Sequence, residues 1–350
     1  MTPLEPPEQH DTLPGVPAPV LTRQLIGQDK QLSFLAHSHE NGRLHHALLF
    51  EGPNGVGKAT AAFHLAQHLL VLPGGSNATQ TLHLLDEDSD EFRQLANGTH
   101  LQVLHLSRPF DAKTEKFKTM LTVDEVRRIG HFLSRTNTGA GYRTVIIDPA
   151  DDMNAAAANA LLKNLEEPPP RTIFVLVSHR AGQLLPTIRS RCQVVQFNAL
   201  GYEELRAVVT EAAPSAGTAS HELLALSEGS VRRAFTLLAF GGLDIVNAAD
   251  QLIGAQTFDA DKAAKLGDAM TGRDADIQYQ LLTDYLASKI ARAAALRANT
   301  TDLRSAMQLA ELHGQTSDML GHAQIYNLDR KQTVFGLIAK LHAKFSEGLL

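Results

Sequence analysis

The sequence predicts an α/β domain followed by all-α domains. Between residues 25 and 197, short apolar runs alternate with helical patterns, which is typical of strands joined by crossover helices in a parallel sheet. After Ala199 only helical patterns follow. At roughly 100 to 200 residues per domain, a chain of 350 residues is long enough for two or three domains.

Three apolar runs are the clearest strands, at residues 47–50, 144–147 and 172–177. Their continuous apolar character predicts a sheet covered by helices on both faces. The helical half carries two apolar stripes at helical spacing, which predict intramolecular core, although one stripe could instead serve subunit contacts. One stripe consists of Ile277, Leu281, Leu282, Tyr285, Leu286 and Ile290, and the other of Val334, Ile338, Leu341 and Phe345.

Two segments are expected to lie outside the folded core. Residues 1–20 contain six prolines and few apolar anchors, which predicts a disordered arm. Residues 73–101 are rich in Gly, Asn and Ser and hold an acidic cluster at 86–91, which is typical of a solvated insertion.

The composition excludes several classes of function. With 32 basic and 38 acidic residues the net charge is −6, so any DNA contact must be local or made through partners. The single cysteine, Cys192, excludes an intramolecular disulfide and a cysteine-based zinc site, and it fits a reducing compartment. No run approaches about 20 apolar residues and no secretion signal is visible, so we expect a cytosolic protein without a membrane partner.

A phosphate-binding loop is predicted directly after the first strand. Residues 52–60 have the sequence GPNGVGKAT, and an apolar helical pattern follows. Gly52, Gly55 and Gly57 allow backbone N–H groups to surround phosphate oxygens. Lys58 is placed to reach the β- and γ-phosphates of a nucleotide.

The positions needed for metal binding and hydrolysis are altered. After the lysine stands Ala59, which lacks the hydroxyl that would bind Mg²⁺, and Thr60 comes one residue late, turned by about 100°. Asp148 ends a predicted strand, where a P-loop ATPase holds magnesium. Pro149 then replaces the Glu that polarises the attacking water. We expect no hydrolysis and no requirement for ATP or Mg²⁺; weak nucleotide binding and a purely structural loop both stay open.

Further motifs resemble the bacterial clamp-loader subunits of DNA polymerase III. The run NAAAANALLKNLEEPP at 154–169 is followed by SHR at 178–180 and LPTIRSRC at 185–192. The resemblance covers the chain from about Leu25 to the C-terminus. The run LDRKQ at 328–332 is similar to alphaproteobacterial members of this family.

The resemblance implies an architecture and a set of partners. It implies an AAA+ P-loop domain at 21–198, a small helical lid domain at 199–248 and a helical collar domain at 249–350, through which subunits form a ring. The ring would load a sliding clamp on primed DNA within the DNA polymerase III holoenzyme, a nucleotidyltransferase complex. The implied partners are gamma or tau motor subunits and the delta subunit, with the clamp and DNA contacted through the complex.

The resemblance also implies roles for single residues. Arg191 would be an arginine finger that acts in trans on ATP bound by a neighbouring subunit; the alternative is a structural ion pair. Ser178 and Arg232 would stand where the family has two nucleotide sensors. A strand-end turn and a helix N-cap at Ser230 explain the same residues equally well.

Zinc and cysteine chemistry are not expected. Relatives carry a cysteine-based zinc module after the P-loop helix, whereas residues 73–110 contain no Cys. His83, His100 and His105 remain, but their spacing is a weak metal pattern. Cys192 is expected to be a buried motif residue rather than a nucleophile.

Three functions are therefore compared. The first is a non-hydrolysing stator that supplies Arg191 to a neighbour. The second is an ATP-hydrolysing AAA+ motor similar to gamma or tau or to a branch-migration helicase, which Ala59 and Pro149 disfavour. The third is a sensor that binds ATP without cleaving it, which Gly57 and Lys58 permit.

Overall fold

A five-stranded parallel sheet organises the first part of the chain. In the computed structural model its order is β2 (Val103–Leu106), β5 (Arg143–Ile147), β6 (Thr172–Ser178), β1 (Ala47–Glu51) and β7 (Gln193–Gln196). The structure describes all residues except 1–3, 5, 73–80, 135–140, 214–218, 273–274, 301, 327 and 350. The chain divides into two units, residues 1–233 and 234–350.

The three predicted strands are confirmed as the adjacent strands β5, β6 and β1. The predicted class, an α/β domain followed by helices, is also confirmed, and the parallel sheet is that expected of an AAA+ P-loop domain. The edge strands β2 and β7 were not predicted, because their sequences, VLHL and QVVQ, are short and carry polar residues.

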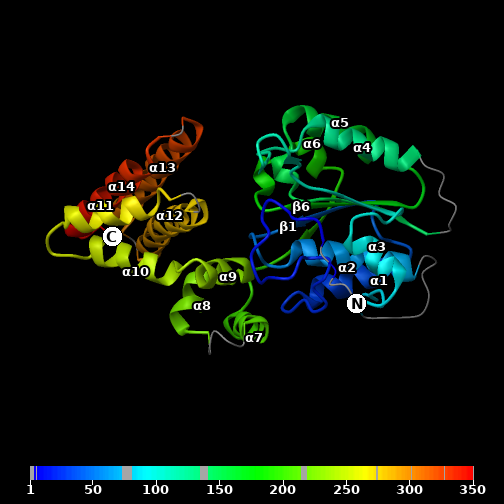
Figure 1. The fold of residues 1–350 in the computed structure, drawn as a ribbon, viewed down its shortest axis with the longest axis horizontal. Helices are drawn as coiled ribbons and strands as arrows, with labels where there is room; N and C mark the ends of the chain where they lie inside the picture. The colour runs from blue at the N-terminus through cyan, green and yellow to red at the C-terminus, as the bar shows by residue number, and fades with distance from the viewer. Residues whose placement is uncertain are drawn as a thin grey trace. The chain divides into compact units, whose positions relative to one another are not determined.

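Helices cover both faces of the sheet, as Figure 1 shows. On one face lie α1 (Asp29–Glu40), α2 (Lys58–Val71) and α3 (Asp90–Ala96), and on the other lie α4 (Val123–Ser134), α5 (Ala155–Glu166) and α6 (Pro186–Arg189). Alternate strand residues such as Leu49, Ile147 and Leu176 form one buried cluster with Ile129 of α4 and Leu161 of α5. The short segments η1 (Ala150–Asp152) and η2 (Ala181–Gln183), and the hairpin of β3 (Phe110–Asp111) and β4 (Lys116–Phe117), complete this part.

In the described part of the chain after the sheet, all regular elements are helices. They are α7 (Tyr202–Ala212), α8 (His221–Ser227), α9 (Val231–Ala239), α10 (Gly242–Ile253), α11 (Ala260–Ala269), α12 (Asp276–Asn299), α13 (Leu303–Ile325) and α14 (Arg330–Ser346). The predicted stripes lie on α12 and α14 and are buried, except that Ile277 is half-buried and Phe345 is 42% exposed. Among the residues that the structure describes, no helix combines the length and apolar character needed to span a bilayer. The boundaries proposed for the lid and collar domains stay a prediction.

The N-terminal arm differs from the expectation of disorder over its described part. Leu13 and Val20 are buried, at 5% and 4% exposure, within the unit that contains the sheet. Thr12 donates its backbone N–H to the carbonyl oxygen of Gln9 at 3.1 Å, which forms a turn. The physical reason is that two apolar side chains in this proline-rich segment gain burial that offsets the cost of ordering it.

Candidate functional site

The predicted order of strand, glycine loop and helix is confirmed. β1 ends at Glu51, the loop runs over residues 52–57, and α2 begins at Lys58. Gly57 precedes the helix with φ 95°, in the left-handed region that favours glycine. The loop therefore lies at the carboxyl edge of the sheet and before a helix N-terminus, where a phosphate group would meet backbone N–H groups.

Packing requires the glycines of this loop. A Cβ atom on Gly52 would lie 2.1 Å from the carbonyl oxygen of Phe197. A Cβ atom on Gly55 would lie 2.3 Å from Cβ of Arg232, and Gly55 has φ +76°. Both distances are shorter than any non-bonded contact of a Cβ atom allows. These two positions therefore need glycine whether or not the loop binds phosphate.

Lys58 is directed back into its own loop. Its Nζ donates to the carbonyl oxygen of Gly52 at 2.7 Å and to that of Pro53. The residue is buried, and burial lowers the pKa of its ammonium group to about 8. The chain's own carbonyl oxygens therefore use two of the three donors that would reach a nucleotide phosphate.

The residues at the positions where a P-loop ATPase binds magnesium provide few ligand atoms. Ala59 has no polar side-chain atom, and Thr60 is buried at 7% exposure. Asp148 follows β5, and its backbone N–H donates to the carbonyl oxygen of Leu106 at 2.9 Å. Burial and then the negative charge of Asp11 raise the pKa of Asp148 to about 7.

Ser178 takes part in a turn at the end of β6. Its hydroxyl donates to Oδ1 of Asp151 at 2.7 Å. The backbone N–H groups of His179 and Arg180 donate to Oδ2 of Asp151 at 2.5 and 3.1 Å. The geometry matches the strand-end turn that the sequence allowed, and a contact between Ser178 and nucleotide stays a prediction.

The segment before α9 contacts the loop. Ser230 donates its hydroxyl to the carbonyl oxygen of Asn54 at 2.9 Å and accepts the backbone N–H of Arg233 at 3.1 Å. Ser230 is thus the N-cap of α9, one of the interpretations that the sequence left open. Nη1 of Arg232 lies 3.2 Å from Oδ2 of Asp11, so this guanidinium is paired with a carboxylate of the N-terminal arm.

Arg191 lies at the amino edge of the sheet, where the parallel strands begin. This edge is opposite the carboxyl edge, where the strands end and the glycine loop lies. Arg191 precedes β7, whose first residue, Gln193, pairs in parallel with Leu48 near the start of β1. The glycine loop follows the other end of β1. The four residues from Leu48 to Glu51 separate the amino edge from the carboxyl edge by roughly 13 Å. Arg191 and the chain's own glycine loop therefore lie at opposite ends of the strands.

Arg191 lines a cavity of about 610 Å³. Its Nη2 lies 2.6 Å from Oε1 of Glu166, and its Nη1 donates to the carbonyl oxygen of Thr187 at 2.8 Å. The cavity is also lined by Arg43, His45, His46, Leu165, Ser190, Cys192 and Gln193. The lining contains two guanidinium groups, those of Arg43 and Arg191, and one carboxylate, that of Glu166, so its positive charge favours an anionic group.

The cysteine and the histidines show no metal or nucleophilic arrangement. Cys192 is half-buried rather than buried as expected, because it lines the cavity. Its partial burial raises the pKa of the thiol to about 12, so thiolate is scarce at neutral pH, which disfavours a nucleophile. His83 donates its backbone N–H to Nδ1 of His68 at 3.0 Å, and Nδ1 of His105 lies 3.2 Å from Nε2 of Gln9. Within the described ranges, no group of three or more His, Cys, Asp or Glu is placed to hold a metal ion.

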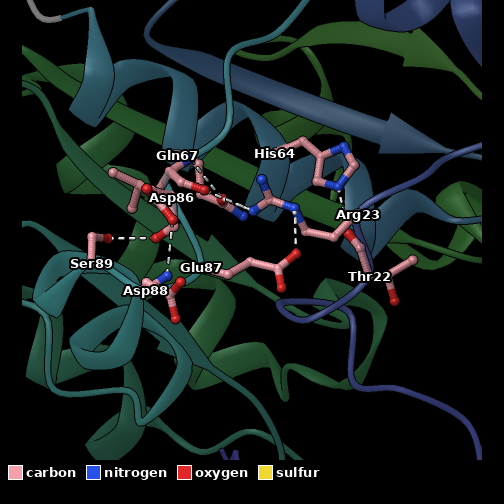
Figure 2. Close-up of polar contacts among 9 residues, drawn as sticks. Thr22, Arg23, His64, Gln67, Asp86, Glu87, Asp88 and Ser89 are labelled. Carbon is pink, nitrogen blue, oxygen red and sulfur yellow. Dashed lines mark hydrogen bonds and ion pairs between the residues drawn. The ribbon is translucent and has the colours of Figure 1, made fainter.

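The described part of the insertion is attached to the helix that follows the loop. Figure 2 shows Arg23 between the two segments. Its Nε lies 3.1 Å from Oε1 of Glu87, and its Nη1 donates to the carbonyl oxygen of Leu85 at 2.8 Å. Gln67 of α2 accepts the backbone N–H of Leu85 at 3.1 Å. Five of the six residues at 86–91 are exposed, as expected for a solvated insertion. The expectation that residues 73–101 lie outside the core is wrong for α3, because its apolar residues Phe92, Leu95 and Ala96 are buried.

Three carboxylates that the sequence analysis did not single out contact the predicted site residues. Asp11 pairs with Arg232, Asp151 binds Ser178, and Glu166 pairs with Arg191. Glu166 stands inside the run at 154–169, and Asp151 follows Asp148 and Pro149, two residues after the proline, so the neighbouring sequence carried a signal for both. Asp11 lies in a proline-rich arm, and no local pattern connects it with the site.

Comparisons with known proteins show what the whole chain is similar to. A profile of the family described as "DNA polymerase III, delta subunit" matches residues 27–201. The delta′ subunit from Pseudomonas aeruginosa is 37% identical over 187 residues, 53% of each chain, and that from Bacillus subtilis is 35% identical over 173 residues, 49% of this chain and 48% of that protein. The DNA polymerase III tau subunit from Escherichia coli is 29% identical over 276 residues, 76% of this chain and 40% of that protein. The chain thus spans about half the length, or less, of these relatives.

Proposed function

The chain belongs to the family described as DNA polymerase III, delta subunit, and we propose that it is a delta′-type stator of the clamp loader that does not hydrolyse ATP. In this role it assembles with gamma or tau motor subunits and the delta subunit, and the ring loads a sliding clamp on primed DNA. Arg191 acts in trans on ATP bound by a neighbouring subunit. The alphaproteobacterial type indicated by residues 328–332 is part of the same proposal.

The position of Arg191 carries this proposal. Its side chain is 36% exposed at a cavity whose lining favours anions, and it lies at the sheet edge opposite the chain's own glycine loop. A guanidinium in that place is too far from the glycine loop of its own chain to contact a phosphate group bound there. It suits the γ-phosphoryl group of a nucleotide held by another subunit.

The chemistry of the chain's own loop supports the non-hydrolysing part. Ala59 supplies no metal-binding hydroxyl, and Pro149 supplies no carboxylate to polarise water. Lys58 donates to loop carbonyl groups, and the carboxyl group of Asp148 has a raised pKa. These features disfavour the motor alternative more strongly than the alternative of an ATP-binding sensor.

The test is a reconstituted ring that contains Arg191→Ala in this subunit. Loss of one arginine finger, worth about 10³ to 10⁵ in rate at its site, should abolish hydrolysis at one neighbouring motor site. We expect a partial loss of clamp- and DNA-stimulated ATP hydrolysis and a larger loss of clamp loading. Arg189→Ala is the matched control, because Arg189 lies two residues away, is 42% exposed and pairs with Glu51.

Three results would contradict the proposal. Equal ATPase and loading rates for the Arg191→Ala and wild-type rings, at matched assembly, would make Arg191 a structural residue. ATP turnover by the isolated chain would identify a motor, and nucleotide binding without turnover by the wild-type chain would identify a sensor.

A further inference from the structure

The N-terminal arm lies at the edge of the sheet where a nucleotide would bind. Nε2 of Gln9 lies 3.2 Å from Nδ1 of His105 on β2, and two residues later Asp11 pairs with Arg232 at the start of α9. The backbone N–H groups of Arg232 and its neighbour Val231 donate to the carbonyl oxygen of Gly55 in the loop, at 3.4 and 3.0 Å. Residues 9–11 therefore run from β2 to the glycine loop.

This part of the arm has a defined conformation. The backbone N–H of Gln9 donates to the hydroxyl of Thr12 at 2.9 Å, and the backbone N–H of Thr12 donates back to the carbonyl oxygen of Gln9. Leu13 is buried immediately after this turn. The turn and the apolar anchor place the carboxylate of Asp11 toward Arg232.

The charge of Asp11 acts on the ends of three neighbouring strands. It adds to burial in raising the pKa of Asp148 after β5. It opposes burial at His179 after β6 and at His105 on β2, where burial lowers the pKa of each imidazole to about 4. These directions agree with the contacts of Gln9 to β2 and of Asp11 to Arg232, whose backbone contacts Gly55, and these contacts place Asp11 near the carboxyl edge of the sheet.

The cations of this site are engaged by the chain itself. Lys58 donates to the carbonyl oxygens of the loop, and the guanidinium of Arg232 is paired with Asp11. A carboxylate and a phosphate group present the same pair of acceptor oxygens to a guanidinium. An incoming polyphosphate would therefore compete with Asp11 for Arg232.

We propose that residues 9–13 are a resident ligand of the degenerate nucleotide site, in which the Asp11 carboxylate occupies the position on Arg232 that a phosphate group of a nucleotide would take. The site binds a polyphosphate only after this segment leaves. The inference goes beyond the clamp-loader role, and because it is tested on the isolated chain its failure is distinct from a failure of that role.

The test is calorimetric titration of ATP into the full-length chain. Asp11→Ala should bind ATP at least tenfold more tightly than the wild type, because the competing carboxylate is removed. Glu8→Ala removes an exposed carboxylate of the same arm and should match the wild type. Adding Arg232→Ala to Asp11→Ala should abolish the gain. Equal affinities of Asp11→Ala and wild type, or no binding by either, would overturn the proposal.

Amide hydrogen exchange supplies an independent readout of the arm. Protection of residues 9–13 should fall in Asp11→Ala and in Arg232→Ala and should persist in Glu8→Ala. Far-UV circular dichroism would show that each variant remains folded. Unchanged protection in the Asp11→Ala variant would show that the ion pair does not hold the segment in the site.

Discussion

The guanidinium of Arg191 lies 2.6 Å from the carboxylate of Glu166 at the wall of a cavity of about 610 Å³. Both side chains are partly exposed, at 36% and 49%, so the ion pair contributes below about 1 kcal/mol to the free energy of unfolding. Its consequence is geometric. Together with the bond from Arg191 to the carbonyl oxygen of Thr187, it holds the guanidinium in one orientation.

Glu166→Gln should therefore weaken the trans-acting role of Arg191 without unfolding the subunit. In a reconstituted ring we expect a smaller loss of stimulated ATP hydrolysis than Arg191→Ala causes. The double variant should lose no more than Arg191→Ala alone, since both changes act through one guanidinium. Steady-state ATPase rates of the four rings measure this coupling.

Glu167→Gln is the matched control for Glu166, because Glu167 is the next residue and is exposed. It should leave the ATPase rate of the ring unchanged. Additive losses from Glu166→Gln and Arg191→Ala would show that the two residues act independently.

The isolated chain should show no ATP hydrolysis above background. Ala59 lacks the hydroxyl that holds the metal, and Pro149 lacks the carboxylate that polarises water. Release of labelled phosphate should be the same for the wild type and for Lys58→Ala. A wild-type rate near that of an ordinary AAA+ motor, lost on Lys58→Ala, contradicts this prediction.

Gly55→Ala should destabilise the protein more than Gly42→Ala does. Both glycines have positive φ, +76° and +63°, but a Cβ atom on Gly55 would meet Arg232 at 2.3 Å, whereas Gly42 has open space around it. We expect a loss of about 2 to 4 kcal/mol for Gly55→Ala and of about 1 kcal/mol for Gly42→Ala. Urea denaturation measures both losses, and equal values would show that the loop relaxes around the added methyl group.

Asp148→Asn should stabilise the chain at pH 8. The pKa of Asp148 is raised to about 7, mainly by burial and by Asp11, so the folded state binds its proton more tightly than the unfolded state. Stability therefore falls as the pH rises from about 4 to about 7, and the full cost is present above that range. We expect a gain of about 1 to 3 kcal/mol at pH 8 that disappears toward pH 4. Lys58, whose charge opposes the shift, reduces the gain.

Urea denaturation at pH 4, 6 and 8 tests this pH dependence. Asp88→Asn is the control, because Asp88 is exposed and its substitution should leave the pH dependence unchanged. An Asp148→Asn variant that is less stable than wild type at pH 8 would show that the carboxylate is needed in its ionised form.

Zinc should be absent from protein purified without a histidine tag. One cysteine cannot provide the thiolates of a structural zinc site, and the residues that the structure describes bring together no substitute group of ligands. Elemental analysis after dialysis is the measurement. Stoichiometric zinc that survives dialysis would assign a metal role to His83, His100 or His105.

Much of the sheet and of the loop was predictable from the sequence, because both depend on local patterns. The runs at 47–50, 144–147 and 172–177 are apolar enough to be recognised as buried strands. The edge strand β7, with only two apolar residues, gave a weaker signal. The burial of Leu13 could not be predicted, because the proline-rich arm has no periodic pattern of apolar residues.

The sequence by itself determined the local chemistry of this protein: the glycine loop before a helix, the alanine and proline at positions 59 and 149, and the arginine within the Ser-Arg-Cys motif. The tertiary structure alone decided which distant groups meet. Asp11 and Arg232 are 221 residues apart, and Arg191 faces the sheet edge opposite the loop because β7 runs parallel to β1. The physical reason is that hydrophobic periodicity and backbone preference act over a few residues, whereas ion pairs between distant segments follow from strand order and from the path of the connecting chain.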